Sequence, residues 1–172
     1  MKKILILYMS LLGLYACDNT VKDEDYQDPK KVNWSERVAQ VSASDSLVQG
    51  QSYISIYSQI YSFSHHKTYN LTAMASLRNT SMHDTIYLSK ADYYDTHGTL
   101  LKSYIKTTVY LAPLETVEIV INETDISGGT GSNFLFDWQT PQNCPEPIFE
   151  GVMTSTAGQQ GLSFTTQSKR LH

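Results

Sequence analysis

The chain has 172 residues, of which 41% are hydrophobic and 17% charged. That length suits one domain with a core of its own, and that composition is globular, which argues against wholesale disorder. Lys2 and Lys3 are the only charged residues among the first 16, so the remainder carries 11 basic and 17 acidic side chains and a formal charge of −6. Nucleic-acid binding requires clustered basic side chains, and those of this chain are scattered, so we expect no nucleic-acid partner.

Residues 1–16 are typical of a signal peptide. Lys2 and Lys3 form a basic start, and an apolar run follows over residues 4–14. A membrane-spanning helix needs roughly 20 apolar residues, and the polar residues from Asp18 onward end this run well short of that length. The segment is therefore predicted to direct export and not to span a membrane.

Residues 14–17, Leu-Tyr-Ala-Cys, resemble the lipobox of bacterial lipoproteins, in which the cysteine thiol takes a diacylglycerol. The resemblance implies that Cys17 becomes the acylated first residue of the mature chain. Each buried acyl methylene contributes about 0.8 kcal/mol, so two or three palmitate-length chains would hold the protein on a membrane. We therefore expect a lipid anchor in the outer membrane. The alternative is an ordinary signal peptide whose cleavage site lies beside a cysteine.

Residues 17–46 are predicted to form the lipidated N-terminus and a tether, because residues 18–28 are polar and acidic. Lys22, followed by three acidic residues, resembles the surface-export signal of Bacteroidetes lipoproteins. The cell surface and the periplasmic face of the outer membrane both remain open as locations. Residues 34–41 are expected to add two turns of helix, with Asn33 or Ser35 as the cap.

From Gln51 onward, residues alternate with a period of two, which predicts β-strands. The first expected strand covers residues 51–61, and similar alternation recurs further along the chain, in residues 71–77, 86–88, 117–121 and 134–138. Turn-forming residues separate these segments, and Asp95 to Gly98 is the clearest hairpin turn. Residues 47–172 are therefore predicted to form an antiparallel immunoglobulin-like β-sandwich of about seven to nine strands, or failing that a jelly roll.

Two glycine-rich segments, residues 125–134 and 158–164, are the most specific features of the chain. Together with further short segments they give it a resemblance to a bacterial family catalogued as domain of unknown function 3124; these segments are residues 57–61, 71–80, 93–98 and 111–116. The resemblance covers about residues 53–164. It implies a secreted or lipid-anchored bacterial domain whose activity is unassigned, and it supplies no catalytic residues.

Residues 125–133, Asp-Ile-Ser-Gly-Gly-Thr-Gly-Ser-Asn, form the first candidate site. Glycines let a backbone turn tightly and present its N–H groups to an anion, while carboxylate, hydroxyl and amide oxygens suit Ca²⁺. The segment lacks the lysine and the following helix of a phosphate-binding loop. A bulged connection between strands is the alternative that we favour. The candidate ligand-binding residues are Asp125, Gly128, Gly129, Gly131, Ser132 and Asn133.

Tyr53, Tyr57 and Tyr61 form the second candidate site, because they share one face of the strand expected over residues 51–61. Isoleucines occupy the opposite face. The tyrosine rings either pack as a second layer or form an exposed aromatic platform for a sugar or another protein.

No residues suggest catalysis or a cofactor. A Ser-His-acid set in a recognisable setting is missing, Cys144 is expected to be an idle thiol, and the histidines at positions 65, 66, 83 and 97 are expected in solvated loops without metal. We therefore expect a non-enzymatic binding or assembly module that holds an envelope protein or a glycan. The alternative is a periplasmic domain that senses a small ligand or metal ion through the glycine-rich loop.

Overall fold

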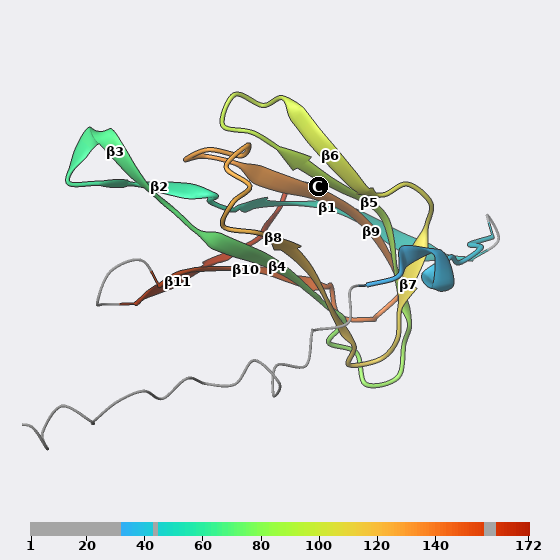
Figure 1. The fold of residues 1–172 in the computed structure, drawn as a ribbon. Helices are drawn as coiled ribbons and strands as arrows, with labels where there is room; N and C mark the ends of the chain where they lie inside the picture. The colour runs from blue at the N-terminus through green and yellow to red at the C-terminus, as the bar shows by residue number, and fades with distance from the viewer. Residues whose placement is uncertain (1–31, 43–44, 157–160) are drawn as a thin grey trace, which may run out of the picture. The chain divides into compact units, whose positions relative to one another are not determined.

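The computed structural model describes residues 32–42, 45–156 and 161–172, and these form two antiparallel β-sheets packed face to face (Figure 1). The predicted all-β, immunoglobulin-like sandwich is therefore confirmed, but the two sheets hold ten strands among the described residues and not the seven to nine expected. The helical element in these ranges is a four-residue 3-10 helix, η3 (Trp34–Arg37). Within the described residues, no helix is long and apolar enough to cross a membrane. The predicted signal peptide and Cys17 lie outside them.

The larger sheet has the strand order β12-β1-β9-β5-β6, and β7 also pairs with β5. Its strands are β1 (Leu47–Ser55), β5 (Ile86–Tyr94), β6 (Leu100–Ile105), β7 (Val109–Leu111), β9 (Asn133–Pro141) and β12 (Lys169–Arg170). The smaller sheet has the order β11-β10-β4-β8. Its strands are β4 (Thr72–Arg78), β8 (Thr116–Ile121), β10 (Ile148–Ser155) and β11 (Leu162–Gln167).

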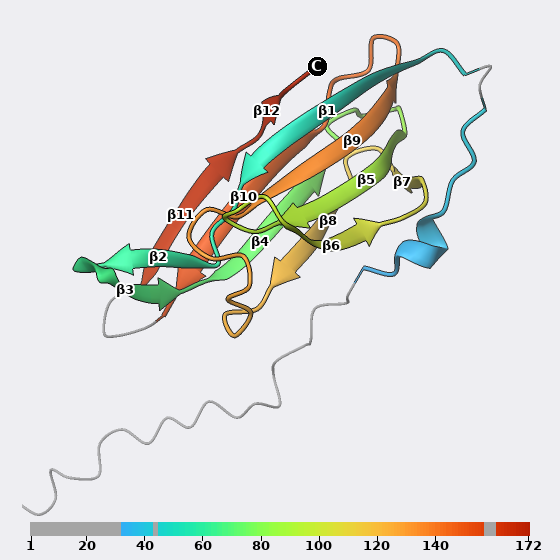
Figure 2. The ribbon, with the colours of Figure 1, turned by 90° about the horizontal axis from the view of Figure 1, so that it is seen from above.

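A two-stranded ribbon, the β2–β3 ribbon, connects the two sheets. It consists of β2 (Gln59–Ser62) and β3 (Ser64–Asn70), with Phe63 at the reversal between them. Figures 1 and 2 show, from two directions, that this ribbon extends beyond the ends of both sheets. It therefore stands away from the core that the two sheets share.

The prediction of one strand over residues 51–61 is wrong, because the chain breaks between β1 and β2. At the break, the main chain bonds to other segments: the Ile56 N–H donates to the Ser132 carbonyl oxygen at 2.9 Å, and the Ser58 carbonyl oxygen accepts from the Leu71 N–H at 2.9 Å. Both Ile56 and Ser58 are fully buried. These bonds turn the chain out of the larger sheet and into the ribbon.

Alternate residues of the strands point between the sheets and form the core. On β9, Phe134, Phe136 and Trp138 are at most 1% exposed, and Phe136 stacks on Phe149 of the opposite sheet with ring centroids 4.4 Å apart. Burial of one such side chain contributes roughly 1.5–3 kcal/mol. Cys144 is a free thiol, so among the described residues these apolar contacts, and not a disulfide, join the sheets.

Strand β12 covers part of the outer edge of β1. It pairs with β1 at Ser52 and Tyr53. The Arg170 guanidinium lies 5.1 Å from the centre of the Trp138 ring and forms an ion pair with Glu146. The edge of the larger sheet is thus held by one short, cationic strand.

Residues 32–42, which fall within the predicted tether, lie against the sandwich. Trp34 packs on the core, and Arg37 Nη2 is 2.6 Å from Glu115 Oε1. The two predicted turns of helix reduce to the single turn η3, because the Ala39 N–H donates to the Thr108 carbonyl oxygen at 2.9 Å and cannot continue the helix. Asn33 is the cap, as expected, and its side chain accepts from the Ser35 N–H.

Candidate functional site

The glycine-rich loop, residues 125–133, connects the two sheets and packs against the β5–β6 turn. Thr96 of that turn makes three hydrogen bonds to the loop. Its N–H and its Oγ1 both donate to the Gly128 carbonyl oxygen at 3.0 Å. Its Oγ1 also accepts from the Gly131 N–H at 2.9 Å. The Gly129 N–H donates to the Ile126 carbonyl oxygen at 3.1 Å. Two of the three glycine N–H groups that were expected to face an anion are therefore used inside the protein.

Close packing explains why glycines occupy this loop. Gly128 is buried, and a Cβ at that position would overlap the Tyr93 hydroxyl. Gly129 has a φ of 71°, which favours glycine. Ser132 is fully buried and donates to the Ile56 carbonyl oxygen at 2.6 Å, and Asn133 begins β9.

Asp125 is exposed, and its carboxylate is engaged by its own turn. The Asp125 Oδ1 accepts from the Ser127 N–H at 3.2 Å and from the Ser127 Oγ at 2.5 Å. This arrangement stabilises the entrance to the loop. The geometry favours the bulged connection over an ion site, and ligand binding by the loop stays a prediction.

The three candidate tyrosines occupy three different environments. Tyr53 lies on β1, on the outer face of the larger sheet, and is half-buried. Tyr57 lies between β1 and β2, and its ring centre is 6.0 Å from that of Phe164 on β11. Tyr61 lies on the β2–β3 ribbon and is 62% exposed. They therefore form no single platform, because the chain leaves the larger sheet after Ser55.

The tip of the β2–β3 ribbon carries the most exposed aromatic side chain among the described residues. Phe63 is 93% exposed, and its φ of 59° lies in the left-handed region, which a bulky residue rarely adopts. The Lys67 ammonium lies 5.6 Å from the Phe63 ring centre and 5.8 Å from that of Tyr69. We call Tyr61, Phe63, Lys67 and Tyr69 the ribbon tip.

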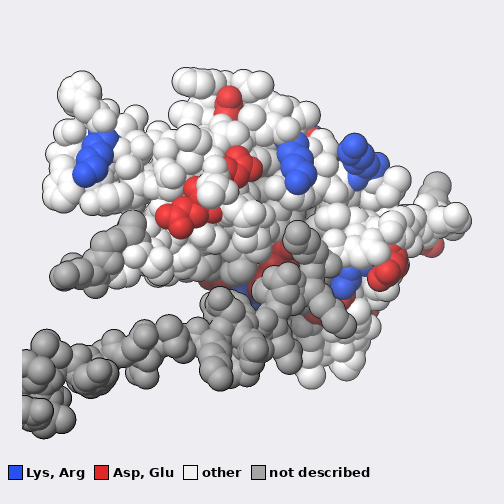
Figure 3. Space-filling model, in the orientation of Figure 1, with Lys and Arg blue, Asp and Glu red and all other residues white. Residues whose placement is uncertain are grey.

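Acidic residues are missing from the sequence between Asp45 and Asp84, a span that includes the whole ribbon. Figure 3 accordingly shows no acidic side chain on the part of this face that the ribbon forms. The remainder of the chain is acidic overall, so the ribbon tip differs from it in both charge and aromatic content.

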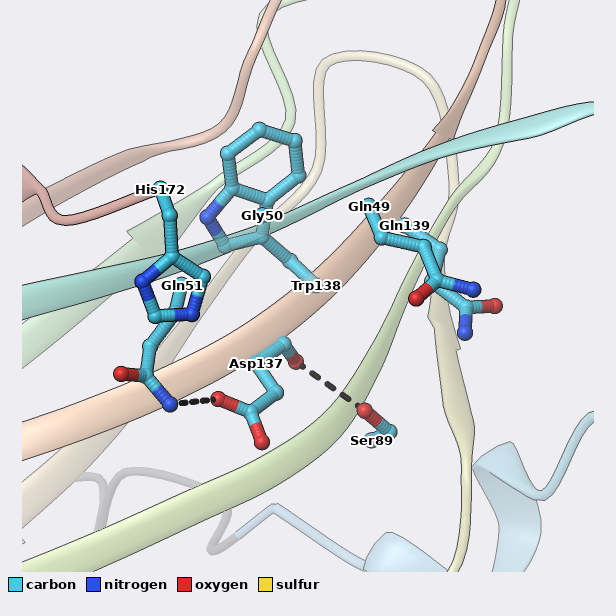
Figure 4. Close-up of a pocket in the computed structure, with 8 residues that line it drawn as sticks. All are labelled: Gln49, Gly50, Gln51, Ser89, Asp137, Trp138, Gln139 and His172. Carbon is cyan, nitrogen blue, oxygen red and sulfur yellow. Dashed lines mark hydrogen bonds between the residues drawn. The ribbon is translucent and has the colours of Figure 1, made fainter.

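A second surface feature is a hollow of about 250 Å³ on the larger sheet, which we call the amide groove (Figure 4). Its lining residues are Gln49, Gly50, Gln51, Ser89, Asp137, Trp138, Gln139 and His172. The Trp138 ring belongs to the core, so the polar groups come mainly from three glutamines and one aspartate.

In the amide groove, Gln51 and Asp137 are paired with each other, whereas the Gln139 side-chain oxygen is not paired. Gln51 Nε2 donates to Asp137 Oδ1 at 2.6 Å, and the Lys90 ammonium lies 4.0 Å from Asp137 Oδ2. By contrast, the buried Gln139 Oε1 has no hydrogen-bond partner among the described residues. An unpaired buried polar atom costs about 1–3 kcal/mol, so a turn of the Gln139 side chain that brought this atom to a ligand in the groove would recover part of that cost.

The other residues considered in the sequence analysis are the histidines and the two cysteines. His65 and His66 lie on β3 and not in a loop, because the ribbon reverses at Phe63, and both are exposed. Among the described residues, no three His, Cys, Asp or Glu side chains gather as metal ligands. Cys144 is half-buried, and burial raises the pKa of its thiol. Cys17 lies outside the described residues, so its acylation stays a prediction.

The predicted turn at residues 95–98 is confirmed. Gly98 has a φ of 80°, and Asp95 Oδ1 accepts from the N–H groups of His97 and Thr99, each at 2.8 Å. The Thr99 N–H, followed by that of His97, holds the pKa of the Asp95 carboxyl below its usual value.

Of the ribbon tip, Tyr61 was identified from the sequence but Phe63, Lys67 and Tyr69 were not, and the amide groove was missed. Phe63 stands where glycine or asparagine normally marks a reversal, so no turn signal was visible. The groove residues come from β1, β5 and β9, which are far apart in sequence. One signal could have indicated the groove: Gln49 and Gln51 occupy alternate, outward positions on β1, and Asp137 and Gln139 do so on β9.

Comparison with solved structures finds a similarity to "Crystal Structure of Thermotoga maritima 1070", at 8% sequence identity and a TM-score of 0.45, covering 70% of this chain and 92% of that chain. Among curated proteins, none matches the chain. Residues 49–171 match the family described as "Protein of unknown function (DUF3124)", and the chain therefore belongs to that family.

Proposed function

We propose that this chain is a non-enzymatic binding module of the bacterial envelope, and that it holds an envelope protein through the ribbon tip. The observation that carries the proposal is Phe63, which is 93% exposed at the reversal of the β2–β3 ribbon. Single exposed apolar residues are common on proteins, but this one is held in an unfavourable backbone conformation among other aromatic residues.

The backbone of Phe63 argues for a role outside folding. A non-glycine residue at a φ of 59° costs of order 1–3 kcal/mol, and glycine or asparagine would remove most of that cost. The ring gains almost no packing in return, because it faces solvent. Such a cost is understandable if the ring packs against a partner, since aromatic anchors dominate the energy of protein interfaces.

The surroundings of Phe63 support the same role. Tyr61 is 62% exposed on the neighbouring strand, and Lys67 holds a cation–π position over both Phe63 and Tyr69. Aromatic side chains have only two side-chain torsions, so they lose little conformational freedom when they dock. The absence of acidic residues from the ribbon favours a partner surface that is neutral or acidic.

The test is crosslinking in living cells with the full chain. A photoreactive phenylalanine analogue at position 63 is expected to capture one discrete envelope protein. The matched control places the same analogue at Val120, which is 51% exposed on β8 of the smaller sheet, and is expected to capture none. Competition by a co-expressed unlabelled chain should reduce the product, and competition by its co-expressed Phe63→Ser variant should not. Equal capture from both positions would refute the proposal.

Anchoring through Cys17 is the second part of the proposal, and the lipobox-like residues 14–17 support it. Cells fed an alkyne-tagged palmitate are expected to label the chain and its Cys144→Ser variant, but not Cys17→Ser. Labelling of Cys17→Ser to the same level would show that this cysteine is not the acylated residue.

A further inference from the structure

The amide groove lies on the outer face of the larger sheet, where three cross-strand rows run side by side, and the glutamines and the aspartate of the first two rows line it. Neighbouring strands β1, β9 and β5 place residues opposite one another in each row, and the intervening residues point into the core. The rows are Gln49–Gln139–Tyr87, Gln51–Asp137–Lys90 and Tyr53–Leu135–Asp92. Carboxamides and tyrosines from three strands therefore share one face.

From this arrangement we propose that the amide groove binds a neutral saccharide chain. A carboxamide both donates and accepts hydrogen bonds, and so does a hydroxyl group, so each glutamine can pair with adjacent hydroxyls of a sugar ring. Gln139 Oε1 is already buried and lacks a partner among the described residues. If the amide were turned the other way, a buried N–H group would stand unpaired at the same place, so the need for a polar ligand does not depend on its orientation.

Charge selects against an ionic ligand. Asp137 supplies a carboxylate to the groove, and that carboxylate is already engaged by Gln51 and faced by the Lys90 ammonium. Lys90 in turn lies 3.6 Å from Asp92. The rows thus hold two carboxylates and one ammonium, and this net negative charge disfavours a phosphate or a carboxylate ligand. Among the described residues, no three His, Cys, Asp or Glu side chains gather there as ligands of a metal ion.

Size and shape favour part of a longer chain over an enclosed small molecule. The groove of about 250 Å³ is smaller than the roughly 300–1,000 Å³ of typical ligand pockets. A second hollow of about 480 Å³ adjoins it and shares Gln49 and Gln139 with it. Tyr87 and Tyr53 lie in the first and third rows, outside the lining of the groove, where their rings could pack against sugar rings of a chain that extends beyond it.

The experiment is calorimetric titration of the full-length chain in a zwitterionic detergent, since glucoside and maltoside detergents would compete for the groove. The neutral probes are cellohexaose, maltohexaose and xylohexaose, and the anionic probe is a galacturonic acid hexamer. At least one neutral probe is expected to bind, and to bind more tightly than the anionic one. Gln139→Ala should weaken that binding about tenfold or more, because it removes the buried amide.

Two further variants make the result specific. Gln49→Ala removes an exposed amide without touching the core and should also weaken binding, whereas Gln142→Ala, in the turn after β9, should leave it unchanged. The proposal is overturned if no neutral probe binds, if the anionic probe binds more tightly, or if Gln139→Ala and Gln49→Ala both bind as the unmodified chain does. Phe63→Ser should retain saccharide binding, so the groove and the ribbon tip can fail independently.

Discussion

The Tyr93 hydroxyl lies 2.7 Å from the Ser58 Oγ, and both side chains are buried beneath the glycine-rich loop. The same hydroxyl donates to the Ser132 Oγ at 3.3 Å, and that oxygen donates to the Ile56 carbonyl. A polar network thus joins the break between β1 and β2 to the end of the loop. It fixes the base from which the ribbon extends.

Tyr93→Phe should destabilise the domain by about 1–3 kcal/mol, because it leaves the buried Ser58 hydroxyl without its partner. Urea unfolding of the purified chain measures the effect. The control is Tyr61→Phe on the ribbon, which should change the unfolding free energy by less than about 0.5 kcal/mol. Equal losses from the two variants would contradict a structural role for the network.

Gly128→Ala should cost about 1–3 kcal/mol, because the added Cβ would overlap the Tyr93 hydroxyl, and Tyr93 is too well packed to move aside. Gly161→Ala is the matched control, since a Cβ there meets its nearest neighbour only at 3.9 Å. In the double variant Gly128→Ala/Tyr93→Phe, the losses should be less than additive, because the second change removes the nearest overlapping oxygen and leaves only the looser contact with Ser132. Strict additivity would argue against the overlap.

The Arg37–Glu115 pair should make stability depend on pH in the acidic range. The Arg37 guanidinium, followed by the Ala112 N–H, lowers the pKa of Glu115 from its ordinary value of 4.5. A lowered carboxyl pKa means that the pair contributes fully above about pH 4.5 and is lost as the pH falls through the folded-state pKa.

Glu115→Gln should therefore cost roughly 0.5–1 kcal/mol at pH 7, and the difference from the unmodified chain should shrink as the pH drops below 4.5. Unfolding free energies measured from pH 7 to pH 3 test this. A difference that persists unchanged at the lowest pH would show that the ion pair is not its source.

Cys144 should react slowly with iodoacetamide in the folded chain, because burial raises the pKa of its thiol and lowers the thiolate fraction. In the Cys17→Ser variant, where Cys144 is the remaining cysteine, alkylation at pH 8 should accelerate when urea unfolds the chain. Equal rates in both states would mean that the thiol is activated or fully accessible in the folded domain.

Several strands of the sandwich were predictable, because a strand that is buried on one face has an apolar residue at every second position. Alternation over residues 117–121 and 134–138 matches β8 and β9, in which every second residue is buried. The turn at residues 95–98 was equally visible, since Gly98 adopts a positive φ that most residues avoid.

The ribbon was not predictable, because its reversal contradicts the usual turn chemistry. Phe63 takes a conformation that normally signals glycine or asparagine, while the alternating tyrosines and isoleucines continue from β1 into β2. The break between the two strands depends on bonds to Leu71 and Ser132, which are distant in sequence. Local pattern alone therefore favoured one continuous strand.

The candidate sites also differ in whether the local sequence or contacts between distant segments define them. The glycine-rich loop drew notice for its composition, yet most of that composition reflects close packing against Tyr93 and Thr96. The amide groove has no recognisable sequence motif, because its residues come from different strands and glutamine is common at solvent-facing strand positions. It becomes visible only when the register brings Gln49 opposite Gln139.

Strand β12 also affects how copies of this domain behave towards one another. An uncovered strand edge is a template on which another chain can add a strand, and edge strands with cationic residues resist such growth. Lys169 and Arg170 place two cationic side chains along the edge of β1, and the Arg170 guanidinium lies over the Trp138 ring. Proteolytic trimming of this short strand would therefore both loosen the cover over the Trp138 ring and open the larger sheet to fibrous aggregation.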